Sequence, residues 1–172
     1  MADTNASRQG YYLRQALYLL KNIHYITLAT TSSDGAPWNT PMGFEHDSEL
    51  HLYWVSDKAA VHSVNVRENN QVFAVLFDST VKNPEDADGL YIQATAEEVQ
   101  SSTEIASIGA LFSMSDSTVK QLLEKEDRRL YRATPQKIWM NDAQIINGIF
   151  KKDYRVELDT SKLEEKLRMY EH

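Results

Sequence analysis

Alternating apolar and polar positions near the start of the chain predict three short strands in a row. Residues 25–31 alternate and are rich in β-branched side chains, and Ser33-Asp34-Gly35 then supplies a turn that contains glycine. The chain returns over 38–45, turns at 46–49, and forms a third strand over 50–55. Strands joined by such short connections pair in antiparallel fashion. The pattern therefore predicts a β-meander.

A helix and a deeply placed strand are predicted next. Residues 58–68 carry Val61, Val64 and also Ala60 on one helical stripe, which predicts a helix that packs through these apolar side chains. Residues 71–78 are apolar at consecutive positions, which is typical of a strand that is buried on both faces.

Further strands surround a helical insertion in the second half of the chain. Residues 89–99 alternate regularly, as expected for an antiparallel strand with one solvated face. Helical spacing over 102–129 predicts an insertion of two helices, which ends in a solvated run of charged residues. A short strand is predicted over 137–140, and another over 149–158 with a break at 151–153.

Helices flank this β-rich region at both ends. Apolar residues at helical spacing predict helices over 6–22 and 161–170, on either side of a barrel that spans about 25–158. No repeat or long linker divides the chain, so 1–172 is predicted to be a single domain. The short, meandering strands favour a mainly β fold, a small antiparallel barrel. A doubly wound α/β fold is the weaker alternative, because it requires strands and helices to alternate.

The net charge, the cysteine content and the length of the apolar runs limit which partners and compartments are expected. The formal net charge is −7, whereas nucleic-acid binding needs several Lys or Arg side chains on phosphates, so no nucleic-acid partner is expected. The 172 residues include no cysteine, which excludes disulfides and thiolate metal sites and fits a reducing compartment. No apolar run approaches the roughly 20 residues of a membrane span, and no cleavable leader is evident. A soluble cytoplasmic protein without a membrane contact is expected.

Known catalytic motifs are missing from the sequence. There is neither a phosphate loop nor a Gly-x-Gly-x-x-Gly turn, and no serine lies in Gly-x-Ser-x-Gly. The five histidines lack a second metal ligand at helical spacing, so no metal site is expected. If the protein is an enzyme, a bound cofactor is expected to supply the reactivity.

The order of several short segments resembles the pyridoxamine 5'-phosphate oxidase-like family of FMN-binding split barrels. The matching segments are Leu28 to Thr31, Asp34 to Pro37, Pro41 to Phe44, Leu52 to Ser56, Ala60 to Asn65, Asn69 to Val72, Gly89 to Ala96 and Arg132 to Trp139. The resemblance implies a split antiparallel β-barrel of about six strands with flanking helices. It also implies a homodimer whose sites lie at the subunit interface and take FMN and a small-molecule substrate.

Site residues follow from the same resemblance, position by position. The second strand would lie along the isoalloxazine ring, the end of the third strand would continue the wall, and the following helix would hold the phosphate. Trp139 would be a wall contributed by the second subunit. The implied cofactor-binding residues are Asn39, Thr40, Pro41, Met42, Val55, Ser56, Lys58, Val61, His62, Asn65 and Trp139.

The sequence departs from the oxidase pattern at four positions. Thr40 and Glu45 stand where oxidase-type members usually carry Arg or Lys, and Val61 and His62 replace a basic pair. The substrate arginine of the true oxidase has no clear counterpart near Trp139. The leading interpretation is an FMN-dependent oxidoreductase of unknown substrate, either oxidase-like or flavin reductase-like. The alternative is a non-enzymatic flavin- or haem-binding module for sensing or storage.

Overall fold

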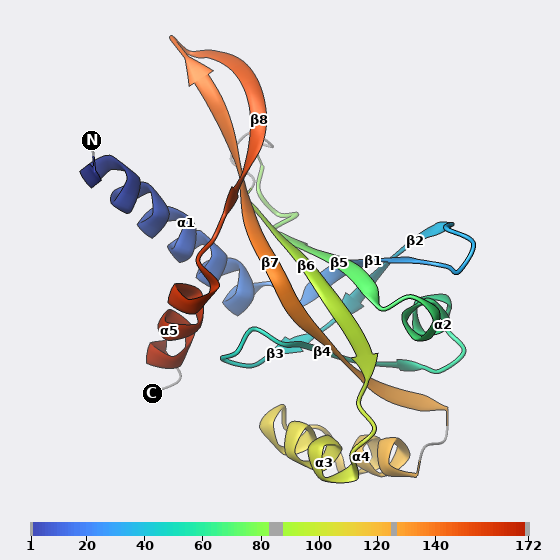
Figure 1. The fold of residues 1–172 in the computed structure, drawn as a ribbon. Helices are drawn as coiled ribbons and strands as arrows, with labels where there is room; N and C mark the ends of the chain where they lie inside the picture. Colours follow the sequence, from blue (N-terminus) through green and yellow to red (C-terminus); the bar gives the residue numbers. More distant parts are fainter. Residues whose placement is uncertain (1, 83–87, 125–126, 171–172) are drawn as a thin grey trace.

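A computed structural model describes residues 2–82, 88–124 and 127–170, and its strands form one antiparallel sheet (Figure 1). The strands are β1 (Tyr25–Thr31), β2 (Pro37–Gly43), β3 (Glu45–His46), β4 (Leu52–Asp57), β5 (Gln71–Phe77), β6 (Gly89–Glu98), β7 (Arg128–Ile146) and β8 (Ile149–Glu157). The helices are α1 (Ala2–Asn22), α2 (Val61–Glu68), α3 (Ser102–Leu111), α4 (Asp116–Leu123) and α5 (Thr160–Tyr170).

The sheet curls into a split barrel. Its strand order is β2-β1-β5-β6-β7-β4-β3, and β3 follows β2 in the chain after the single residue Phe44. The two ends of the sheet are therefore joined by one continuous segment. This confirms the predicted split antiparallel barrel with flanking helices, although the sheet has eight strands rather than about six. The additional strand β8 pairs with β7 and forms an arm that projects from the barrel (Figure 1).

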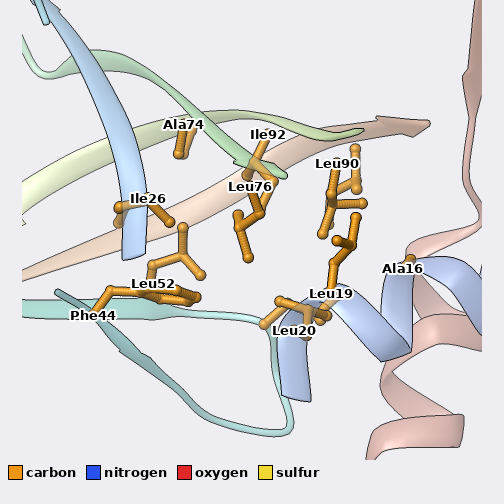
Figure 2. Close-up of a cluster of buried hydrophobic side chains, with 14 of the residues drawn as sticks. Ala16, Leu19, Leu20, Ile26, Phe44, Leu52, Ala74, Leu76, Leu90 and Ile92 are labelled. Carbon is orange, nitrogen blue, oxygen red and sulfur yellow. The ribbon is translucent and has the colours of Figure 1, made fainter. Parts of the chain in front are cut away.

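A single apolar cluster fills the barrel. Alternate residues of neighbouring strands point inward, among them Leu28, Leu76 and Ile92, none of which is more than 1% exposed. Helix α1 closes one end with Leu19 and Leu20, which lie beside the strand residues in Figure 2. Burying a leucine completely contributes about 1.5–3 kcal/mol. The packing of this cluster is therefore the main source of stability.

Helices α3 and α4 cover a second, smaller cluster. Tyr53 on β4 and Leu130 on β7 point away from the barrel interior and pack against Ile105, Ile108 and Leu122. The Tyr53 ring also lies 5.4 Å from the Phe112 ring, measured between centroids. Both faces of β4 are therefore covered over residues 52–54.

Several predicted boundaries are wrong. Helix α1 begins at Ala2 rather than at residue 6. The helical insertion does not reach 129, because β7 begins at Arg128 and pairs with the end of β4. Residues 125–126 of the predicted insertion lie outside the described part of the chain.

Strand β7 also runs on where the sequence suggested interruptions. It continues through Pro135, where a bulge places Pro135 opposite Ala94 and Lys137 opposite Gln93. A bulge is one of the few places where a strand tolerates the missing N–H group of proline. The predicted break at 151–153 is likewise absent, since β8 pairs with β7 across a second irregularity.

Strand β5 lies deep in the sheet, but only one of its faces is buried. It sits between β1 and β6, and Val72, Ala74 and Leu76 point into the core. On the opposite face Phe73 is 37% exposed and Phe77 is 46% exposed. The prediction that both faces are buried is therefore wrong for a single chain. The sheet presents an open aromatic face.

Candidate functional site

The N-terminus of α2 has no side-chain cap. Ala60 occupies the N-cap position with φ −60° and ψ 144°, and it offers no side-chain acceptor. The first intrahelical bond runs from the Val64 N–H to the Ala60 carbonyl, so the amides of residues 61–63 have no partner within the helix. Such amides, together with the helix dipole, favour an anion. No acidic residue lies in this first turn.

The buried face of α2 consists of three polar side chains and the apolar Val66. His62, Ser63 and Asn65 are at most 7% exposed. Ser56 Oγ and His62 Nε2 share a hydrogen bond of 2.6 Å, and Asn65 Nδ2 donates to Thr30 Oγ1 over 3.0 Å. These contacts join the helix to the ends of β4 and β1.

The predicted apolar stripe on this helix is wrong. Val61 is 46% exposed, whereas the polar residues beside it point inward. The surface beneath the helix offers Thr30 and Ser56 to the polar residues, while the apolar contact with the core is made by Val66 instead. Burial lowers the pKa of His62, because the charged imidazolium is poorly solvated there. At neutral pH the ring is therefore uncharged and acts as a hydrogen-bonding group.

The predicted β2 residues lie on two different faces. In the β1–β2 register Thr40 is opposite the buried Leu28, and Met42 is opposite the buried Ile26. Thr40 and Met42 thus belong to the core side of the sheet, while Asn39 and Pro41 are exposed on the other side. Within one subunit these four residues cannot line the same face of a ring.

The predicted residues at the end of β4 also point in different directions, namely Val55, Ser56 and Lys58. The Ser56 hydroxyl points to His62, whereas Val55 packs against the cluster under α3 and α4. Lys58 Nζ lies 3.1 Å from a carboxylate oxygen of Asp127, and the Lys58 carbonyl accepts a 2.8 Å hydrogen bond from Arg67. Lys58 is thus part of an ion pair at the surface beside α2.

Trp139 lies on the open aromatic face of the sheet. Its ring stacks on Phe73, with centroids 6.3 Å apart and an interplanar angle of 22°. Tyr91 stands beside both on β6, and the Arg155 guanidinium lies 4.2 Å from the centroid of the Tyr91 ring. The structure therefore brings Ser56, His62 and the Asn65–Thr30 pair to one corner and leaves Trp139 on the open face of the sheet.

Two contributors to the corner were missed in the sequence, Thr30 and Trp38. Thr30 is 2% exposed and stands at the inward position that follows Ile26 and Leu28 in β1. A polar residue at a predicted core position was the available signal. Trp38 donates from Nε1 to Thr40 Oγ1 over 2.8 Å and is 48% exposed, and no pattern marked it.

The described residues lack two further features. They contain no helix that is both long and apolar enough to cross a membrane. They also contain no group of three or more His, Asp or Glu side chains that could hold a metal ion.

The strand order and the flanking helices define a split-barrel protein. The sequence profile described as pyridoxamine 5'-phosphate oxidase matches residues 13–142. The chain therefore belongs to the pyridoxamine 5'-phosphate oxidase family, as the short segments predicted. No curated protein sequence matches it significantly.

Solved structures share the fold at low sequence identity. The haem storage protein HutZ from Vibrio cholerae is 21% identical with a TM-score of 0.59, covering 73% of this chain and 91% of its own. A haem-binding protein from Mycobacterium smegmatis is 14% identical with a TM-score of 0.63, covering 86% of this chain and 57% of its own. An F420 reductase is 24% identical with a TM-score of 0.52, covering 70% of this chain and 93% of its own. At these identities the similarity establishes the fold.

Proposed function

We propose that this chain is a homodimeric FMN-binding flavoprotein of the cytoplasm that acts as an oxidoreductase on a small molecule. The observation that carries the proposal is the uncapped N-terminus of α2, which stands over a buried polar corner. A helix end with free amides and no acidic residue in its first turn is suited to a phosphate group. The family supplies the expectation that this phosphate belongs to FMN.

The residues at the corner fit the phosphate end of FMN. The amides of residues 61–63 would donate to the phosphate oxygens, and Lys58 would add positive charge at the rim. His62 is neutral, so its contribution is to hold the Ser56 hydroxyl in place through their 2.6 Å hydrogen bond. When bound, FMN supplies the redox chemistry, while the chain binds and orients it.

A second subunit would complete the site. One chain places Asn39 and Pro41 on the open face of the sheet and Thr40 on the core side. The same open face carries the stacked rings of Phe73 and Trp139 and the half-exposed Phe77. An exposed aromatic surface of this kind marks an interaction site. Pairing two copies through it would bury these rings and bring Trp139 to the partner.

Haem is the alternative ligand, and two haem proteins among the structural neighbours support it. The corner itself favours FMN. His62 Nε2 is already engaged by Ser56, and His62 is only 7% exposed, so this nitrogen is not free to bind iron. A haem titration followed in the Soret region therefore serves as the competing measurement. Strong haem binding without flavin binding would favour the alternative.

A charged cap on α2 tests the flavin proposal. Ala60→Asp places a carboxylate at the N-cap, where it accepts hydrogen bonds from the free amides. We expect it to stabilise the protein by about 0.5–2 kcal/mol. The same carboxylate competes with and repels a phosphate. We therefore expect FMN affinity, measured by quenching of flavin fluorescence, to fall by at least about tenfold.

Ala60→Ser is the matched control, because it caps the helix without adding charge. We expect a similar gain in stability and a smaller loss of FMN affinity. An Ala60→Asp protein that is more stable and binds FMN as tightly as the wild type would place the phosphate elsewhere. Sedimentation of the wild type at micromolar concentration tests the dimer separately, and a strict monomer would contradict the composite site.

A further inference from the structure

A second candidate site lies on the face of β4 opposite to the Ser56 side chain, with Val55 in its lining. It is a surface groove of about 320 Å³ where the connection between α3 and α4 meets β2, β3 and β4. Its lining residues include the aromatic residues Tyr25, Tyr53 and Phe112, while Phe44 and Trp54 also border it but are buried in the main core cluster. Pockets of this size with aromatic walls and few polar groups are typical of small-molecule sites.

Strand register sets the shape of the groove. Glu45 is directly opposite Tyr53 in the β3–β4 pair, so its carboxylate stands on the same face as the Tyr53 ring. Tyr25 is opposite Gly43 in the β1–β2 pair, and the missing side chain of Gly43 leaves the Tyr25 ring 70% exposed. Phe112 closes the far wall, with its ring centroid 5.4 Å from that of Tyr53.

The charge of the groove is negative. The described residues that line it include one carboxylate, Glu45, and neither lysine nor arginine. None of the ion pairs or side-chain hydrogen bonds among the described residues involves the Glu45 carboxylate, so this charge is available to a ligand. The faces of aromatic rings are themselves electron-rich and attract cations.

We propose that this groove binds a small organic cation of the pyridinium or quaternary ammonium type. Glu45 supplies the counter-charge, the 70% exposed ring of Tyr25 supplies cation–π contact, and Phe112 beside the nearly buried Tyr53 supplies apolar contact. The same lining disfavours a phosphate ester or carboxylate, because Glu45 repels an anion and the described lining contains neither lysine nor arginine. This inference does not depend on flavin binding, and it assigns the groove a ligand of opposite charge to the one proposed for α2.

Three probes with the same ring and different charge test the proposal. 1-Methylnicotinamide is cationic, nicotinamide is neutral and nicotinate is anionic. Calorimetric titration into the wild-type protein should rank them in that order, with the cation bound about tenfold more tightly than the neutral ring. The measurement is made with and without added FMN, so that failure of flavin binding does not obscure the result.

Variants then assign the preference to the groove. Glu45→Gln should reduce the advantage of the cation about threefold, and Glu45→Lys should abolish cation binding. Tyr25→Leu keeps apolar area and removes the ring. It should lower the affinity for the cation about threefold while leaving the affinity for neutral nicotinamide nearly unchanged. Glu165→Gln on α5 makes the same change of net charge outside the groove and should have no effect.

Several results of these titrations would contradict cation binding in the groove. Equal affinity for the three probes, no binding of the cation at 10 mM, or full cation binding by Glu45→Lys would overturn the proposal. A cation preference that Glu45→Gln and Glu165→Gln reduce equally would also overturn it, since the preference would then reflect the net charge of the protein.

Discussion

Helices α1 and α2 both lie against the barrel, but the side chains that they bury differ in polarity. Helix α1 closes one end with apolar side chains such as Leu19 and Leu20, whereas α2 buries one apolar residue, Val66, beside the polar side chains of His62, Ser63 and Asn65. Burying apolar surface stabilises a fold directly. Burying polar groups costs free energy unless each finds a partner. The comparison indicates that α1 serves stability, and that the sequence of α2 reflects a second requirement.

The free-energy contributions of these two kinds of buried contact also differ in size. A buried leucine contributes about 1.5–3 kcal/mol, while a paired hydrogen bond contributes a net 0.5–1.5 kcal/mol, roughly. The two hydrogen bonds of the α2 face therefore stabilise the fold less than two leucines of α1 do. Elements with little buried apolar area open locally at lower free energy. Such an element is suited to admit a ligand.

Leu19→Ala in α1 gives the largest expected effect. Leu19 is 1% exposed, and its truncation leaves a cavity in the main cluster, so we expect a loss of about 2–5 kcal/mol in the free energy of unfolding. Urea denaturation measures the loss. FMN affinity of the remaining folded protein should be unchanged. Leu111→Ala, at a position that is 62% exposed, is the control and should cost less than about 1 kcal/mol.

Asn65→Ala in α2 should cost less, about 1–3 kcal/mol, because it leaves the buried Thr30 hydroxyl unpaired. The double variant Thr30→Val/Asn65→Leu removes both polar groups, and we expect it to recover most of that stability. FMN affinity should nevertheless stay at least about tenfold below the wild type, since the polar floor of the corner is lost. Full recovery of both properties would show that this hydrogen bond serves packing alone.

His62 gives the smallest effect, as a dependence of stability on pH. Its pKa is lowered in the folded state, so the unfolded chain binds more protons than the native protein below the ordinary histidine pKa of about 6.5. The stability that depends on neutral His62 is thus fully present above this pH and is lost as pH falls through the folded-state pKa. Urea midpoints between pH 7.5 and 5 should decline less in His62→Gln than in the wild type. An identical decline in both proteins would contradict this assignment.

Periodicity predicted the barrel strands well where their inward positions are apolar over several residues. Residues 89–99 show this clearly, since Leu90, Ile92, Ala94 and Ala96 are all buried in β6. Periodicity failed to predict burial where the polarity of the neighbouring surface decides which side chains of a helix face inward. In α2 the apolar Val61 is exposed, and polar Asn65 is buried, because the end of β1 offers Thr30 as a partner.

The candidate site could be predicted only in part, for a related reason. The segment order indicated the corner at Ser56 and His62, and these two residues do meet. Strand alternation separates Asn39 from Thr40, however, and Trp139 stands on the open face with Phe73. A resemblance that assigns contacts position by position does not distinguish residues of one subunit from those of its partner. The missing information is the geometry of the dimer.

A paired titration of FMN and riboflavin tests the central claim most directly, because the two flavins differ only in the phosphate. If the uncapped end of α2 holds that phosphate, the protein should quench FMN fluorescence at low micromolar concentration. FMN should also bind at least about tenfold more tightly than riboflavin. The difference should shrink in Ala60→Asp. Equal affinities for the two flavins, or unchanged fluorescence with both, would contradict the account.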